Sequence, residues 1–434
     1  MKILQNNTRL IYNKFTNLIV VSILITLTFS PIASSTQNLD SQSPEPLSGT
    51  KELDLLRAEH YLYFTATENV SEFNIRYAFP PDYSYQVPIM MELLNDSNAD
   101  VINYRIQDDK NEPNLIVNFT IGEMEKNETK YIHFNYYVLV NNFDYSDYPK
   151  KVKFPKNSEL PDETKIWLTP TDVVQSKSLI IKLKAREIRG INNNLVRFAD
   201  RVAKFTRLHR YFLFLFQLYT GTLGPQDAIT TLFRNGECPG RSHLGAALFR
   251  SQGVPARIIL ANPSNKLWYQ VHCMNEYYLP NYGWILTEVH KGIVPYEAKN
   301  QVILRICYPE DEQNTHTDYF FKKMTGVEYW FWIDNDNVIP YYVDLVEGSK
   351  TNMFKESEQM TDSFTADYSF FITKQVFYYY KMFLGESLTG DNQAHFENAV
   401  NIQFEAMVKL KQQNPEEYAF LMDMALDEYK EIEL

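Results

Sequence analysis

The chain alternates apolar and polar residues with a period of two from Glu52 to about Thr169. One such run is Phe73 to Phe79, in which every second residue is large and apolar, and similar runs span 115–121 and 132–140. This period is typical of half-buried strands. Turn-forming residues such as Pro80-Pro81-Asp82 separate the runs, so residues 52–169 are predicted to form an antiparallel β-sandwich domain.

The apolar period changes to that of a helix after Thr171. Five residues at i, i+3, i+4, i+7 and i+10 define one helical face: Leu195, Phe198, Ala199, Val202 and Phe205. Further helices are predicted from Pro225 to Asn235 and from Cys238 to Gly253, followed by strands near 257–260, 267–278 and 284–289. Residues 170–345 are therefore predicted to form an α+β domain in which the helices precede the sheet.

The C-terminal residues 346–434 are predicted to be helical. Asn414 is placed to cap a helix whose first position is Pro415, and the residues that follow give that helix an apolar face. No chemistry is evident in this region.

The N-terminus has the pattern of a targeting segment. Lys2, Arg9 and Lys14 precede the apolar run 18–29, and small residues follow at 31–35. We interpret residues 1–35 as a signal peptide, with an uncleaved N-terminal anchor as the alternative, and residues 36–51 as a flexible linker. The protein is therefore expected to be secreted or held on the extracellular face of the membrane, with this segment as its only membrane contact.

The composition and charge of the chain bear on which molecules it binds and how it is modified. The chain has 434 residues and a formal charge of −12, which argues against nucleic acid because Lys and Arg carry affinity for phosphates. Four Asn-x-Ser/Thr sequons predict a glycosylated exterior, although an Asn-rich chain also makes such triplets by chance; they begin at Asn69, Asn95, Asn118 and Asn127. The three cysteines leave at least one thiol without a partner in the chain.

Cys238 is the first candidate for chemistry. A cysteine at the start of a helix lies beside unpaired backbone N–H groups, which stabilise a thiolate. Gly236 before it and Pro239-Gly240 after it permit a tight entry turn, in which the Cys238 amide could face a developing oxyanion. Taken alone, a single cysteine near the start of a helix is more often a small buried apolar residue.

His272 and Glu288 form the second candidate. The segment 279–283 separates two strands, and a hairpin centred near Pro280 would place His272 directly opposite Glu288. The carboxylate could then orient the imidazole while its other nitrogen accepts the thiol proton. The alternative is an ordinary cross-strand pair, because a slip of one residue would destroy the register.

Together these residues resemble the core motif of the transglutaminase-like superfamily. Gly236-Glu237-Cys238 and then Gly253-Val254-Pro255-Ala256-Arg257 resemble its cysteine helix and closing turn. His272 and Pro280-Asn281-Tyr282-Gly283-Trp284 resemble its histidine strand and following turn, and 167–172 resembles the lead-in of exported microbial relatives. The resemblance covers 167–292.

The resemblance implies a papain-like α+β fold and a Cys-His-Asp triad that acts on amide bonds through a thioester. Cys238 matches the nucleophile and His272 the base. Glu288 stands where the family usually has Asp, and Met274 where an aromatic residue is common. These two departures weaken the expectation of turnover more than that of the fold.

The other candidate ligands have weaker claims. Cys273 is predicted to face away from His272 as a core residue, and a disulfide between Cys273 and Cys307 is conceivable. His243 and His290 are expected to be surface or packing residues. The acidic run 334–337 resembles the start of a calcium loop but lacks its later Gly and Glu, so we interpret it as a polar turn. No zinc-ligand spacing occurs, and no metal or cofactor is expected.

The sequence therefore predicts an exported cysteine enzyme that hydrolyses peptide or side-chain amides in a protein or peptide substrate. Two alternatives remain open. The site could transfer the acyl group to an amine and crosslink proteins, or the core could be inactive and serve as a binding or scaffolding module.

Overall fold

The computed structural model describes residues 50–433, except 84, 142–144, 146–147, 221–224, 264–271, 298–300, 313–330, 344–345 and 348. The described chain mixes helices with antiparallel sheets and ends in helices, and the predicted fold class is thus confirmed. The predicted signal peptide and most of the linker lie outside the described residues. No helix among the described residues is long and apolar enough to cross a membrane.

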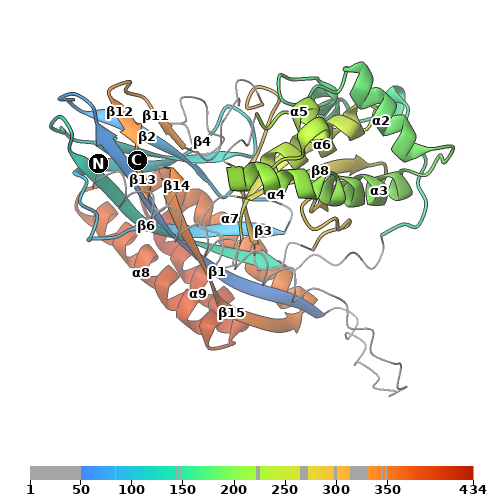
Figure 1. The fold of residues 1–434 in the computed structure, drawn as a ribbon. Coiled ribbons are helices and arrows are strands. Elements are labelled where there is room, and N and C mark those ends of the chain that lie inside the picture. The colour runs from blue at the N-terminus through green and yellow to red at the C-terminus, as the bar shows by residue number, and fades with distance from the viewer. Residues whose placement is uncertain are drawn as a thin grey trace, which may run out of the picture.

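Two antiparallel sheets form the sandwich (Figure 1). The strands of the first sheet run in the order β12-β1-β6-β3, and β15 also pairs with β1; their bounds are Val338–Pro340, Thr50–Ala66, Thr129–Asn141, Gln86–Leu93 and Ser349–Asp362. The strands of the second run in the order β11-β2-β5-β4, with bounds Phe331–Ile333, Phe73–Phe79, Leu115–Ile121 and Val101–Asp108.

Strand β6 shows why the alternating pattern produced this sandwich. Its even-numbered Phe134 and Tyr136 contact Tyr77, Phe79 and Phe119 of the second sheet, with ring centroids 5.4–5.9 Å apart. Its odd-numbered Tyr137 faces the other way and packs against a C-terminal helix. Successive side chains on a strand point to opposite faces, so both faces of β6 are covered.

The sandwich also takes strands from a part of the chain expected elsewhere. Strands β11 and β12 lie in the range predicted for the second domain, and β15 lies in the range predicted to be helical. In the structure β11 pairs with β2, and β12 and β15 pair with β1 of the sandwich. The described residues from 346 to 362 are therefore not helical; β14 (Val346–Glu347) pairs with β13 (Tyr342–Val343), and β15 follows. Sequence periodicity does not reveal pairing between strands nearly 300 residues apart.

The second domain begins with short 3-10 turns at Asn157–Glu159 and Asp162–Leu168 and continues with five helices. The helices are α2 (Leu179–Arg189), α3 (Leu195–Leu208), α4 (Tyr211–Thr220), α5 (Ala228–Arg234) and α6 (Cys238–Arg250). Helix α5 begins three residues later than predicted, because the Asp227 carboxylate accepts from the Ile229 and Thr230 amides and caps it there. Helix α6 ends three residues before Gly253, whose φ of +76° closes the turn that follows.

Helix α6 packs on a four-stranded antiparallel sheet whose order is β10-β7-β8-β9. The strands span Gln301–Ile306, Ala256–Pro263, His272–Leu279 and Gly283–Thr287. Helices α2 and α3 cover the other side of α6. All residues of α6 after Cys238 are buried, as expected for a helix between a sheet and an outer helical layer.

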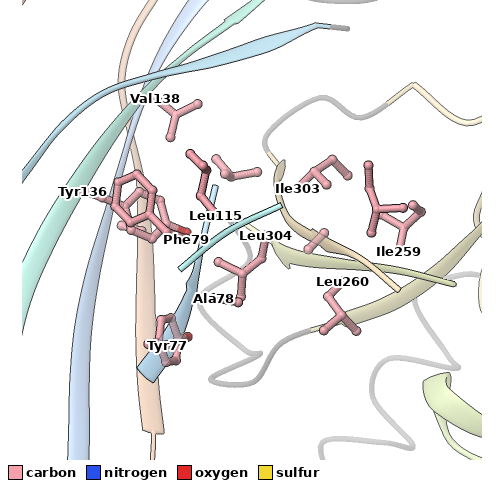
Figure 2. Packing of buried hydrophobic residues seen from close by; sticks show 14 of the residues in the cluster. Tyr77, Ala78, Phe79, Leu115, Tyr136, Val138, Ile259, Leu260, Ile303 and Leu304 are labelled. Carbon is pink, nitrogen blue, oxygen red and sulfur yellow. The ribbon is translucent and has the colours of Figure 1, made fainter. Parts of the chain in front are cut away.

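The two domains share one core (Figure 2). Ile303 and Leu304 of β10 and Ile259 and Leu260 of β7 lie beside sandwich residues such as Leu115. The free edge of β10 is closed by two buried amide side chains of the sandwich. Gln86 bonds the amide and carbonyl of Ile303 at 2.7 and 2.8 Å, and Asn114 does the same for Ile306 at 2.8 and 2.7 Å. The sheet of the second domain is thus bonded to the sandwich, because an edge strand leaves backbone groups that need partners.

Three C-terminal helices cover the sandwich: α7 (Ser363–Phe383), α8 (Asp391–Lys411) and α9 (Pro415–Lys430) (Figure 1). Tyr137 of β6 contacts Phe404 of α8 with ring centroids 6.2 Å apart. The predicted cap of the last helix is present, since the Asn414 side chain accepts from the Glu417 amide at 3.1 Å.

Candidate active site

Cys238 is the first residue of α6, as predicted. Its entry turn is shaped by Gln226, whose side-chain oxygen accepts from the Glu237 amide at 2.9 Å. A Cβ on Gly236 would lie 2.8 Å from that oxygen, and one on Gly240 would lie 2.7 Å from it. The two glycines therefore allow the turn to close over Gln226. This packing leaves the partly exposed Cys238 thiol at the positive end of α6.

His272 and Glu288 are joined by a hydrogen bond. His272 Nε2 lies 2.6 Å from Glu288 Oε2, and the other carboxylate oxygen accepts from the His290 amide at 2.9 Å. Glu288 is 1% exposed, so both of its oxygens are held inside the protein. The bond at Nε2 leaves Nδ1 as the imidazole nitrogen available to the thiol.

The predicted register of the hairpin was wrong, although the contact exists. The observed pairs Asn275–Thr287 and Leu279–Gly283 centre the turn on residue 281 rather than 280. Strand β9 ends at Thr287, and Glu288 bridges to Ile293 instead of pairing with His272. Glu288 therefore reaches His272 along a diagonal. Long side chains can cover such diagonals, which are wider than directly opposed pairs.

Cys238 and His272 each shift the pKa of the other toward its charged form. A hydrogen bond from Cys273 holds the pKa of Cys238 well below its usual range. Burial opposes this shift, and the hydrogen bond and charge of His272 add to it. Burial alone would lower the pKa of His272, but the Glu288 carboxylate and Cys238 raise it well above 6.5. Both shifts favour the thiolate–imidazolium form of the pair over the neutral form.

Cys273 lies at the site, which the sequence interpretation did not foresee. It is fully buried, as expected of a core residue, yet its thiol and its backbone amide both help to lower the pKa of Cys238. His272 and Cys273 begin β8, so the α6 terminus meets the end of this strand and contacts both residues. Cys273 and Cys307 are both free thiols, and the disulfide considered between them is not formed.

Arg241 and His290 contact each other beside the site. Arg241 is 1% exposed; its Nε donates to the Gly236 carbonyl at 2.9 Å, and its Nη1 lies 3.3 Å from His290 Nδ1. Burial, followed by the charge of Arg241, lowers the pKa of His290 to about 4, so its neutral ring accepts from the guanidinium. His243 is a packing residue, as predicted, and lies 2.5 Å from the Gln226 carbonyl. No motif in the sequence singled out Gln226 or Arg241.

Glu237, which precedes the candidate nucleophile, is partly buried beside it. Burial and then the negative charge of Cys238 raise the pKa of Glu237 to about 7. The charge next to the thiolate therefore changes within the neutral range.

The remaining motif residues converge on Arg257. Its guanidinium lies 2.6 Å from Glu276, which also accepts from the Tyr83 hydroxyl at 2.7 Å. The Trp284 and Trp167 rings flank it at 3.9 and 5.1 Å. The conspicuous Arg and Trp of the motif thus support the sheet and its contact with the sandwich, whereas Cys238 and His272 form the exposed part of the site.

No metal-binding arrangement is evident near Cys238 among the described residues. The calcium-like run is a turn, as predicted, in which the Asp334 carboxylate accepts from the Asn74 amide at 2.7 Å. Elsewhere, Asp54 and Glu358 belong to the one described group of three carboxylates close enough to share an ion, but Lys355 already lies 3.0 and 2.8 Å from them.

A partly exposed thiol at a helix N-terminus, beside an imidazole on an antiparallel sheet, defines the site as that of a cysteine enzyme of papain-like architecture. Residues 183–289 match the family model described as Transglutaminase-like superfamily, which confirms the resemblance for this segment. No curated protein matches the chain.

Two solved structures are similar to the chain. One, from Cytophaga hutchinsonii, is provisionally described as a cysteine protease; it is 14% identical, with a TM-score of 0.47 over 70% of this chain and 100% of its own. The other, from Parabacteroides distasonis, is provisionally described as a protease; it is 11% identical, with a TM-score of 0.21 over 52% of this chain and 42% of its own.

Proposed function

We propose that the protein is an exported cysteine enzyme that hydrolyses peptide or side-chain amide bonds through Cys238, His272 and Glu288. The observation that carries the proposal is the 2.6 Å contact of the His272 ring with the buried Glu288 carboxylate, beside a Cys238 thiol whose pKa His272 lowers. A base oriented by a third group and placed against a nucleophile is the arrangement that covalent catalysis needs.

The reaction has two steps. The Cys238 thiolate attacks the amide carbonyl carbon, and the developing oxyanion can accept from the Cys238 amide at the start of α6. The His272 imidazolium gives its proton to the leaving amine as the C–N bond breaks, which leaves a thioester on Cys238. The neutral imidazole then takes a proton from water, the hydroxide adds to the thioester, and the C–S bond breaks to release a carboxylic acid and to restore the Cys238 thiolate beside the imidazolium. Glu288 holds the ring in place and stabilises its charged form throughout.

The pKa directions predict a broad optimum. Activity rises with pH through the lowered pKa of Cys238 and falls as pH passes the raised pKa of His272. The raised pKa of His272 also stabilises the fold below about pH 6.5, and this contribution is lost as pH rises through the folded-state value.

Labelling of the folded protein with iodoacetamide at neutral pH tests the nucleophile. We expect a single rapidly modified residue, Cys238, and loss of labelling in Cys238→Ala. The matched control is Cys307→Ala, which removes a buried thiol that is not among the influences on the pKa of Cys238 and should label like the native chain. Failure of Cys238 to label in the folded protein would refute the proposal.

Hydrolysis is favoured over transfer because an exported site has abundant water. Incubation with a glutamine-containing protein and a labelled amine separates the two outcomes. Ammonia release or peptide cleavage without incorporation of the amine is the result expected of a hydrolase, whereas incorporation that requires Cys238 would establish the crosslinking alternative.

An inactive scaffold is the second candidate, because Glu288 and Met274 depart from the usual motif. If Cys238 labelled rapidly but Cys238→Ala left every cellular phenotype of the chain unchanged, a binding role would replace the enzymatic one.

Export is part of the proposal and is supported by the N-terminal pattern at 1–35. Three of the four sequon asparagines, Asn69, Asn95 and Asn127, are exposed on the sandwich, whereas Asn118 is half-buried and donates to Asn74 at 3.3 Å. Mass spectrometry of the exported chain before and after glycosidase treatment tests this part, with carbohydrate expected at the exposed sites.

A further inference from the structure

We infer that α4 and the end of α3 form a docking surface for a membrane bearing anionic headgroups. This surface, the α4 surface below, comprises Leu208, Tyr211, Phe212, Leu213, Phe216 and Tyr219, together with the basic residues Lys204, Arg207 and Arg210. The inference is independent of the catalytic proposal.

Helix α4 projects large apolar side chains into solvent. Its ten residues include no charged side chain, and Phe212, Phe216 and Tyr219 are 79%, 57% and 60% exposed. Leu208, just before the helix, is 68% exposed. Nothing among the described residues covers these side chains. Soluble proteins rarely expose contiguous apolar patches of this kind unless the patch has a partner.

The charge around α4 indicates what that partner is. Residues 179–220, which span α2 to α4, hold nine Lys and Arg residues against two acidic ones, a formal charge of +7. The whole chain carries −12, so all other residues together carry −19. Arg186, Arg197 and Arg207 are exposed and pair with no acidic side chain of the described chain. Positive charge is thus concentrated in the helices that precede the exposed aromatic helix of an acidic protein, and Arg207 and Arg210 lie next to it in the chain, whereas Lys204 pairs with Asp200 at 2.8 Å.

The combination fits a lipid surface better than a protein partner. A single helix that projects Phe, Tyr and Leu side chains offers no groove for a peptide, but such side chains insert at the boundary between headgroups and acyl chains. Basic residues next to them are attracted to anionic headgroups. Lys204, Arg207 and Arg210 end α3 and lead directly into α4, so both kinds of side chain occur within one segment.

The position of α4 links this surface to the site. Tyr211, the first residue of α4, lies 5.7 Å from the Arg241 guanidinium, and Arg241 holds the Gly236 carbonyl in the turn before Cys238. Figure 1 shows α4 in the same lobe as α6 and β8. Docking through α4 would therefore hold the Cys238 thiol close to the membrane surface.

Depth measurements on the full-length chain test the inference even if the N-terminal segment is also anchored. A fluorophore is attached to Phe216→Cys or, as the matched control, to the equally exposed Phe420→Cys on α9, both in a Cys238→Ala background. Cys273 and Cys307 are fully buried and leave the introduced thiol as the reactive one. Phe212→Cys provides a second position if Phe216→Cys unfolds.

With phosphatidylglycerol-containing vesicles we expect a blue shift and strong quenching by lipid-borne quenchers at position 216 but not at 420. Adding Arg207→Glu should reduce the inserted fraction roughly tenfold, because each basic residue near an anionic surface contributes to binding, and high salt should reduce it as well. Lys430→Glu on α9 is the control and should leave insertion unchanged.

Three results would overturn the inference. The first is equal quenching at positions 216 and 420, or none at either. The second is binding of soluble polyglutamate through α4 without insertion into vesicles, which would indicate an acidic protein partner. The third is concentration-dependent dimerisation that Phe216→Ser abolishes, again without insertion, which would show that a second copy covers the surface.

Discussion

Replacement of Cys273 by alanine is the sharpest test of how the site activates its thiol. The hydrogen bond from Cys273 is the largest influence that lowers the pKa of Cys238, ahead of its interactions with His272. Removal of this donor should therefore raise the pKa of Cys238. The fold should tolerate the change, since Cys273 is a small buried side chain and alanine leaves only a small cavity.

The magnitude follows from the strength of such bonds. A hydrogen bond to a charged group contributes about 1.5–3 kcal/mol, and a thiol is a weak donor, so the lower end applies. Since about 1.4 kcal/mol corresponds to a factor of ten, the rate of Cys238 alkylation at acidic pH should fall about tenfold in Cys273→Ala as the pKa of Cys238 rises. The reactivity of Cys238 should fall at acidic pH. At high pH it should approach that of the native chain, because Cys238 is then ionised in both proteins.

The assay is the rate of iodoacetamide alkylation of Cys238 as a function of pH, with thiolate absorbance as an independent measure. Cys307→Ala is the control, because it makes the same deletion at a buried site that does not hydrogen-bond to Cys238. An unchanged profile in Cys273→Ala, or an equal shift in Cys307→Ala, would refute the reasoning.

Three other changes test the remaining contacts. Glu288→Asp should lower kcat by about 10²–10⁴, because the shorter Asp side chain cannot reach His272 along the diagonal. Glu288→Gln should lower kcat by a similar factor, because it removes the carboxylate charge. Full activity of the Asp variant would contradict this geometry. In the native chain, alkylation by anionic iodoacetate relative to neutral iodoacetamide should fall as pH rises through about 7, and a similar fall in Glu237→Gln would show that Glu237 is not the group responsible. Arg257→Met should cost about 3–5 kcal/mol in urea unfolding because it leaves Glu276 buried without its cation, and a loss below about 1 kcal/mol would show that the pair is not structural.

Local patterns predicted several helices of the second domain and of the C-terminal region well. The face of α3, the start of α6 at Cys238 and the cap at Asn414 depend on residues within one or two turns of each other, and the structure contains all three. Physical signals of this range are present in any short window of the sequence.

Long-range pairing was not predictable in the same way. Strands β11 and β12 are only three residues long and β15 is mostly polar, so only their hydrogen bonds to β2 and β1 assign them to the sandwich. Cys273 was missed for a related reason. Strand alternation places its side chain on the opposite face from His272, but the terminus of α6 meets the end of β8 and contacts both residues.

Glu288 shows how a predicted contact can survive a wrong strand register. The hairpin centre moves from residue 280 to residue 281, which removes the direct opposition of His272 and Glu288 but keeps both on the same face, because the sum of paired residue numbers changes by two. The distance to be covered then becomes a diagonal, and the extra methylene of Glu relative to Asp supplies the reach. Glu288, which in sequence is a departure from the usual triad, is therefore the residue that this register requires.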